Sequence, residues 1–318
     1  MQKKNILLTG GAGFIGSNLL RAFFDAKRIG FIRVLDNLAT GNLNNIRQFN
    51  GRSNYEFIEG DIRDYEVCLA ATEGIDIICH QAALGSVPRS VENPLLTNEV
   101  NISGTLNIFN AAVTRKIDRI VYAASSSTYG DNDTLPKREE NIGAPLSPYA
   151  VTKYVNELYA QVFNRTYGIH SIGLRYFNVF GPNQSPEGAY AAVIPLFIQA
   201  ALRNQSPRIN GDGSNSRDFT YVDNAVQANL LALFTEDPLA LDQVYNVACG
   251  EQTSLNQLWG HIKSMTGCNA DPFYGPPRKG DIPHSLADIQ KATRLLGYHP
   301  QVSISEGLNK TVAWFKEK

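Results

Sequence analysis

The chain has 318 residues, which is enough for one large domain or for two fused domains that share a cleft. Hydrophobic residues make up 43% and charged residues 19%, and the formal net charge is -1, so charge gives no reason to expect nucleic acid or an anionic membrane as a partner. No apolar run approaches the roughly 20 residues that span a bilayer, and the first residues form too short an apolar segment for a signal peptide. We therefore expect a cytoplasmic protein.

The cysteines are few and widely spaced: Cys68, Cys79, Cys249 and Cys268. They form no CxxC pair, and no cluster of His, Cys and Asp has the spacing of metal ligands. Reduced thiols and no bound metal are the expectation.

Apolar runs alternate with stretches of helical periodicity along the first half of the chain. The expected strands cover residues 5–9, 31–37, 55–62, 75–83 and 119–125. Helical stretches such as residues 101–115 lie between them, which predicts right-handed βαβ crossovers and a parallel sheet. The fold class is therefore α/β, a Rossmann-type doubly wound parallel sheet.

The texture changes after the run at 169–181, where Pro, Gly and Asn become more frequent. We place a first domain at residues 1–180 and a smaller C-terminal α/β domain at residues 181–318. No long linker separates them, so the two domains are expected to interleave around one cleft.

The first strand is followed by TGGAGFIG, with Gly10, Gly13 and Gly16 in a GxxGxxG pattern. Such glycines allow a tight turn and close approach of a pyrophosphate to backbone N–H groups at a helix N-terminus. Asp36 ends the second expected strand, where a carboxylate binds a ribose 2′-hydroxyl and repels a 2′-phosphate. The pattern predicts NAD rather than NADP; the alternative is a glycine turn that binds no ligand.

Tyr149 and Lys153 stand four residues apart in SPYAVTKY, behind Ser147 and Pro148, which suit the N-cap and first position of a helix. The two side chains should share one helix face. A nearby ammonium favours the phenolate, so Tyr149 could remove a hydroxyl proton while hydride leaves the same carbon for NAD. An ordinary amphipathic helix is the alternative.

Three consecutive hydroxyls, Ser125, Ser126 and Ser127, close the strand at 119–125. Ser125 is expected to bind the reacting hydroxyl and relay its proton to Tyr149, while Ser126 and Ser127 hold substrate oxygens. Turn chemistry alone would also place serines at a strand end.

The motifs GGAGFIG, SSSTYG, YAVTK and RYFNVFGP together resemble the extended short-chain dehydrogenase/reductase family of nucleotide-sugar enzymes, across essentially the whole chain. Within it the chain is most similar to UDP-hexose 4-epimerases, and among these to the bacterial branch that acts on UDP-N-acetylglucosamine. The resemblance implies a UDP-sugar substrate and a tightly bound NAD that is regenerated in each turnover.

The resemblance also implies the residues of the site. For the cofactor these are Gly10, Gly13, Phe14, Ile15, Gly16, Asp36, Asn37, Asp61, Ile62, Ala82, Tyr149, Lys153 and Tyr176. For the substrate they are Gly85, Ser86, Arg89, Ser126, Ser127, Asn178, Arg217, Arg278, Asp281 and Ser285. Arg217 and Arg278 would hold the diphosphate, which guanidinium groups suit.

The reaction has to be separated from the fold. Dehydratases of this family carry an Asp-Glu pair after the strand-end hydroxyl, where this chain has Ser126 and Ser127. Oxidation at C4, rotation of the 4-ketosugar and reduction on its other face therefore fit best. A non-catalytic redox sensor would need neither the Tyr-Lys pair nor the arginines.

Two small residues bear on the sugar. Ser285 and Gly85 stand where simple UDP-galactose 4-epimerases often carry tyrosine and lysine, which leaves room for an N-acetyl group at C2. Arg89 could instead accept the C6 carboxylate of UDP-N-acetylglucosaminuronate, and loop packing alone could also explain small residues. UDP-glucose stays an alternative substrate.

The helices expected at 101–115 and 148–166 carry apolar residues on more than one face. The resemblance suggests that they pair across a homodimer, and burial within one subunit is the competing explanation.

Overall fold

The computed structural model describes residues 3–187, 191–277 and 282–318. Its main body is a sheet of seven parallel strands in the order β11-β6-β5-β4-β1-β2-β3. The strands are β1 (Lys4–Thr9), β2 (Ile29–Asp36), β3 (Tyr55–Glu59), β4 (Ile77–His80), β5 (Arg119–Ser125), β6 (His170–Tyr176) and β11 (Gln243–Val247). The order reverses direction between β1 and β4, so the predicted Rossmann-type sheet is confirmed.

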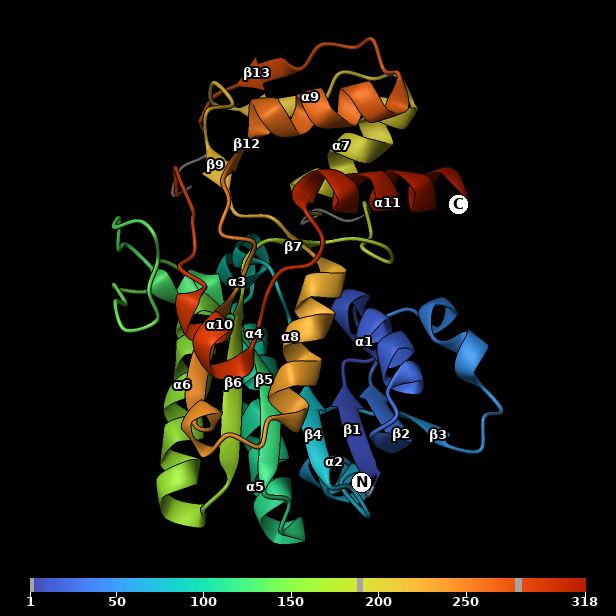
Figure 1. Cartoon of the computed structure of the whole chain (residues 1–318), viewed down its shortest axis with the longest axis vertical. Coiled ribbons are helices and arrows are strands. Elements are labelled where there is room, and N and C mark those ends of the chain that lie inside the picture. The colour runs from blue at the N-terminus through green and yellow to red at the C-terminus, as the bar shows by residue number, and fades with distance from the viewer. Residues whose placement is uncertain (1–2, 188–190, 278–281) are drawn as a thin grey trace.

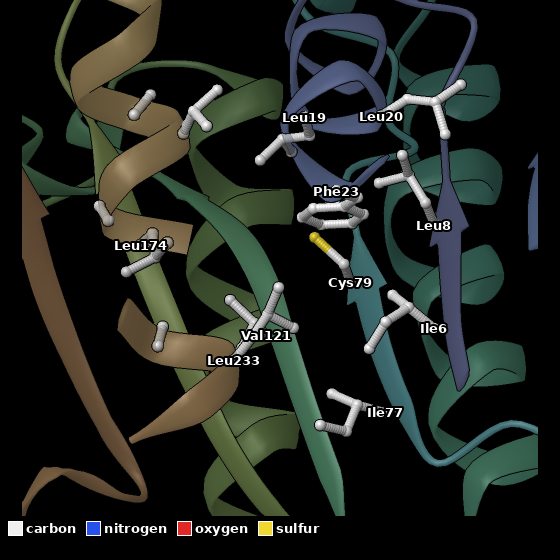
Figure 2. Packing of buried hydrophobic residues seen from close by; sticks show 14 of the residues in the cluster. Ile6, Leu8, Leu19, Leu20, Phe23, Ile77, Cys79, Val121, Leu174 and Leu233 are labelled. Atoms are coloured by element: carbon white, nitrogen blue, oxygen red, sulfur yellow. The ribbon is translucent and has the colours of Figure 1, made fainter. Parts of the chain in front are cut away.

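Helices cover both faces of this sheet, as Figure 1 shows. On one face pack α2 (Tyr65–Ala71), α5 (Thr105–Arg115) and α6 (Pro148–Tyr167), and on the other α1 (Phe14–Asp25), α8 (Val222–Phe234) and α10 (Gln290–Leu296). Figure 2 shows the packing on the face covered by α1, α8 and α10, where Phe23 of α1 and Leu233 of α8 lie against side chains from four strands. A parallel sheet buried on both faces explains why its strands read as nearly continuous apolar runs.

A smaller lobe lies beyond the carboxyl ends of the strands (Figure 1). Its core lies among α7 (Val193–Leu202), α9 (Leu255–Thr266) and α11 (Ile304–Lys316). Short strands complete it: β7 (Val179–Phe180), β8 (Arg208–Asn210), β9 (Ser216–Arg217), β10 (Thr220–Tyr221), β12 (Thr253–Ser254) and β13 (Phe273–Gly275). Because α8, β11 and α10 return to the large sheet, the chain passes between the lobes more than once, and the boundary near residue 180 stays a prediction.

The helix that carries the Tyr-Lys pair has clear local signals. The Ser147 side chain accepts a hydrogen bond from the backbone N–H of Ala150, Pro148 occupies the first turn, and Gly168 ends the helix with φ +73°. The helix expected at 101–115 is less regular. Short helices α3 (Val87–Glu92) and α4 (Pro94–Asn98) precede it, and it begins with a π-helical turn, Glu99–Gly104, before α5.

In the part of the chain that the structure describes, no helix is both long and apolar enough to cross a membrane. All four cysteines are free thiols, and three of them are buried.

Candidate active site

The glycine turn leaves no room for side chains at two positions. Gly10 has φ +72°, and a Cβ there would lie 2.7 Å from the backbone nitrogen of Ala82. A Cβ on Gly16 would lie 2.0 Å from the carbonyl oxygen of Gly10. The turn after β1 is therefore packed directly on its own helix and on the loop after β4, which opens the strand ends to a ligand.

A cavity of about 870 Å³, here called the glycine cavity, lies over these strand ends. Of the predicted cofactor residues it is lined by Gly10, Gly13, Phe14, Ile15, Gly16, Asp36, Asn37, Ile62, Ala82, Tyr149, Lys153 and Tyr176. Asp61 is not among the lining residues. Its carboxylate accepts hydrogen bonds from Asn37 (2.9 Å) and Arg63 (2.7 Å), and Arg63 lowers the pKa of Asp61 to about 2.

Asp36 ends β2 at the wall of the glycine cavity. One carboxylate oxygen accepts a hydrogen bond from the backbone N–H of Ala12 (2.9 Å) and the other from that of Leu38 (2.8 Å). Burial raises the pKa of Asp36, and these N–H groups oppose the rise. A carboxylate fixed beside a glycine turn that excludes side chains fits the ribose and pyrophosphate of a dinucleotide.

Ser125, Tyr149 and Lys153 come together at the inner wall of the same cavity. The Lys153 ammonium donates a hydrogen bond to the carbonyl oxygen of Ala123 (2.9 Å), and only 4% of the residue is exposed. Burial lowers the pKa of Lys153 to about 8, and the negative charge of Glu157 opposes this. The shared face that the four-residue spacing predicted is thus present.

Burial also acts on the tyrosine of the pair. It raises the pKa of Tyr149, whereas the hydrogen bond with Ser125 lowers it. Of the two partners named from the sequence, Ser125 thus acts in the direction that favours the phenolate. The contribution of Lys153 to the acidity of Tyr149 stays a prediction.

No motif in the sequence indicates the buried imidazole that lies near Lys153. His80, at the end of β4, lies between the hydroxyls of Thr9 (2.7 Å) and Thr105 (3.0 Å). Burial, with the nearby charge of Lys153, lowers the pKa of His80 to about 3, so the ring is neutral at pH 7. It ties the ends of β1 and β4 to α5 and adds no second cation beside Lys153.

A second cavity of about 490 Å³, here called the serine cavity, adjoins the first. Of the predicted substrate residues it is lined by Ser126, Ser127, Asn178, Arg217 and Ser285. Ser125 and Asn178 line both cavities, so the two form one continuous cleft with the predicted proton relay at their junction.

The other predicted substrate residues lie elsewhere. Gly85, Ser86 and Arg89 line the glycine cavity rather than the serine cavity. Arg278 and Asp281 fall outside the described residues.

Several polar residues at the cleft were missed by the sequence analysis, Gln184 and Lys137 among them. Gln184 lines the glycine cavity, and its side-chain oxygen is buried with no hydrogen-bond partner among the described residues. Lys137 lines the serine cavity and is only 4% exposed. Backbone pairing with Leu286 and Asp288 brings Lys137 to the cleft, whereas Gln184 follows the RYFNVFGP motif and is held by local hydrogen bonds to Gly181 and Val179.

A comparison with family models matches residues 6–248 to the NAD dependent epimerase/dehydratase family. The chain belongs to this family. Membership confirms the resemblance inferred from the motifs and makes NAD the cofactor, in agreement with the shape of the glycine cavity.

Relatives of this family match the chain over nearly its full length. A putative UDP-glucose 4-epimerase of Methanocaldococcus jannaschii is 40% identical over 98% of both chains. The UDP-N-acetylglucosamine 4-epimerase of Methanobrevibacter ruminantium was solved with UDP-N-acetylmuramic acid. It matches this chain with a TM-score of 0.93 and 39% identity, and the match covers 100% of this chain and 99% of the epimerase chain. The UDP-glucuronic acid 4-epimerase of Bacillus cereus, solved with UDP-glucuronic acid and NAD, has a TM-score of 0.91 and 30% identity, with 98% and 99% covered.

Proposed function

We propose that this chain is a NAD-dependent UDP-sugar 4-epimerase that interconverts UDP-N-acetylglucosamine and UDP-N-acetylgalactosamine. The observation that carries the proposal is the placement of Ser125, which lines both cavities, beside Tyr149 in the glycine cavity. A sugar in the serine cavity would there bring its reacting carbon to the cofactor. Relatives that act on UDP-sugars support the same class of substrate.

The residues suit a reaction that takes a proton and later returns it. The Tyr149 oxygen would accept the proton of the sugar 4-hydroxyl through Ser125, and the Lys153 ammonium would stabilise the phenolate. NAD, when bound, supplies the hydride acceptor and donor for C4. Ser126 and Ser127 stand where an eliminating enzyme needs an acid and a base, so water loss lacks its catalytic groups.

Room for an N-acetyl group supports the choice of sugar. A Cβ on Gly85, which lines the adjoining glycine cavity, would meet no atom within 4 Å, so open space lies beside it. Ser285 presents a small side chain to the serine cavity.

The test is proton NMR of the purified enzyme without added NAD, incubated separately with UDP-N-acetylglucosamine, UDP-glucose and UDP-N-acetylglucosaminuronate. The proposal expects new anomeric signals from all substrates that fit, and the fastest from UDP-N-acetylglucosamine. Faster conversion of UDP-glucose would contradict the assignment of the sugar. No conversion of any substrate by protein that contains NAD would contradict epimerisation itself.

The proposal includes a homodimer. Val151, Leu158 and Val162 are 45%, 43% and 50% exposed and follow one side of α6 at spacings of seven and four residues. A second copy would cover this apolar stripe. Light scattering of the chain and of a Leu158→Asp variant tests this: the expected results are dimer and monomer, and a monomeric wild-type chain at micromolar concentration would refute it.

A further inference from the structure

Lys137 is a buried cation that the proposed reaction does not use. It follows the loop after Tyr129 and is fixed at its backbone: its N–H donates to the carbonyl oxygen of Leu286 (2.7 Å), and its own carbonyl accepts from Asp288 (2.9 Å). Only 4% of the residue is exposed, and it lines the serine cavity. It therefore forms part of the wall of that cavity.

The ammonium has little compensation from the protein. It donates a hydrogen bond to the carbonyl oxygen of Asn132, and no ion pair of Lys137 occurs within residues 3–187, 191–277 and 282–318. Burial lowers the pKa of Lys137, and the charge of Asp133 opposes this. A buried ammonium without a carboxylate costs free energy, which an anionic ligand would offset.

A UDP-sugar offers two places for such a charge, the diphosphate and a carboxylate on the sugar. Arg217, the predicted diphosphate residue, is tied to the segment that carries Ser285 at its start, because its guanidinium donates to the carbonyl oxygen of Pro283 (3.2 Å). Lys137 is tied to the end of the same segment, at Leu286 and Asp288. The two cations are thus tied to different residues of the segment that carries Ser285, and the diphosphate already has Arg217 as its predicted partner.

We propose that Lys137 binds a carboxylate at C6 of the sugar and so lets this cleft accept UDP-N-acetylhexosaminuronates. The inference rests on the proposed function, because it assumes a UDP-sugar in the serine cavity. It also moves the role that the sequence suggested for Arg89, since Arg89 lines the glycine cavity and Lys137 lies with the serines.

The test compares kcat/KM for UDP-N-acetylglucosaminuronate, UDP-N-acetylglucosamine and UDP-glucose in wild type, Lys137→Met and Lys137→Arg. Lys137→Met should lower kcat/KM for the uronate by about 10- to 100-fold, because a hydrogen bond between charged groups is lost, and should leave both neutral sugars nearly unchanged. Lys137→Arg should restore much of the uronate activity. Arg138→Met is the matched control: this neighbouring cation is exposed, pairs with Asp288 and does not line the serine cavity.

Other outcomes would overturn the inference in distinct ways. Equal loss on all three sugars would show a structural role for the Asn132 contact. Loss on both N-acetylated sugars with UDP-glucose spared would place the ammonium on the acetamido oxygen, and weaker binding of UDP alone would place it on the diphosphate. If wild type converts UDP-N-acetylglucosamine but not the uronate, the inference fails and the proposed function stands. If wild type contains NAD and converts none of the three, the proposed function itself fails.

Discussion

The glycine cavity and the serine cavity are built in different ways. The ends of neighbouring parallel strands shape the glycine cavity, so its main residues lie at the ends of β1, β2 and β5 and at the start of α6. The serine cavity is assembled from loops of both lobes, with Lys137, Arg217 and Ser285 brought together by long-range backbone pairing. The glycine cavity is therefore fixed by the fold of the sheet, whereas residues of the serine cavity can be replaced without disturbing the sheet.

The largest effect on activity should come from a substitution that disrupts the glycine cavity. Gly16→Ala places a Cβ 2.0 Å from the Gly10 carbonyl oxygen, so the turn must shift and NAD should be lost together with all activity. NAD released from denatured, purified protein measures this directly. Gly260→Ala is the control, because a Cβ on that exposed helix residue meets nothing within 4 Å. A Gly16→Ala protein with a full complement of NAD would show that the turn does not determine cofactor binding.

In the glycine cavity, beside Ser125, Tyr149→Phe should lower turnover of the preferred UDP-sugar by about 10²- to 10⁴-fold, because it removes the group that takes and returns the proton. NAD content and UDP binding should be unchanged. Tyr154→Phe serves as control, since Tyr154 lines a hollow on the outer side of α6 and not the cleft. Wild-type turnover in Tyr149→Phe would exclude this tyrosine as the acid-base group.

The glycine cavity and the serine cavity also differ in how far the sequence could predict their residues. Gly10, Gly16, Asp36 and Lys153 were found because strand ends and helix turns place them by local spacing. Lys137 has no such signal: it reaches the cleft because its backbone pairs with residues 286–288, about 150 positions away in the chain. The π-helical turn Glu99–Gly104 that precedes α5 also departs from the regular helix that the apolar periodicity predicts.

In the serine cavity, Ser285→Tyr should shift the substrate preference while leaving the epimerisation reaction intact. The larger ring would fill space next to the serines, so the ratio of kcat/KM for UDP-N-acetylglucosamine over UDP-glucose should fall by about 10- to 200-fold. Ser53→Tyr, on an exposed loop, should leave the ratio unchanged. If Ser285→Tyr lowers kcat/KM for both sugars equally, the position does not select between them.

The smallest effect concerns the free energy of unfolding, which the burial of Lys153 in the glycine cavity lowers. Burial lowers the pKa of Lys153 to about 8 from an ordinary value of 10.5, so between these pH values the unfolded chain binds more protons than the folded one. The contribution of Lys153 to the free energy of unfolding is therefore unfavourable below pH 8 and recovers as the pH rises towards 10.5. Lys153→Met removes this dependence. Its stability relative to wild type, measured by urea unfolding of NAD-free protein, should be highest near pH 7 and should decline as the pH rises through that window. A constant difference between pH 7 and 10 would mean that Lys153 keeps an ordinary pKa in the fold, and that holding its charge beside Tyr149 costs the protein little.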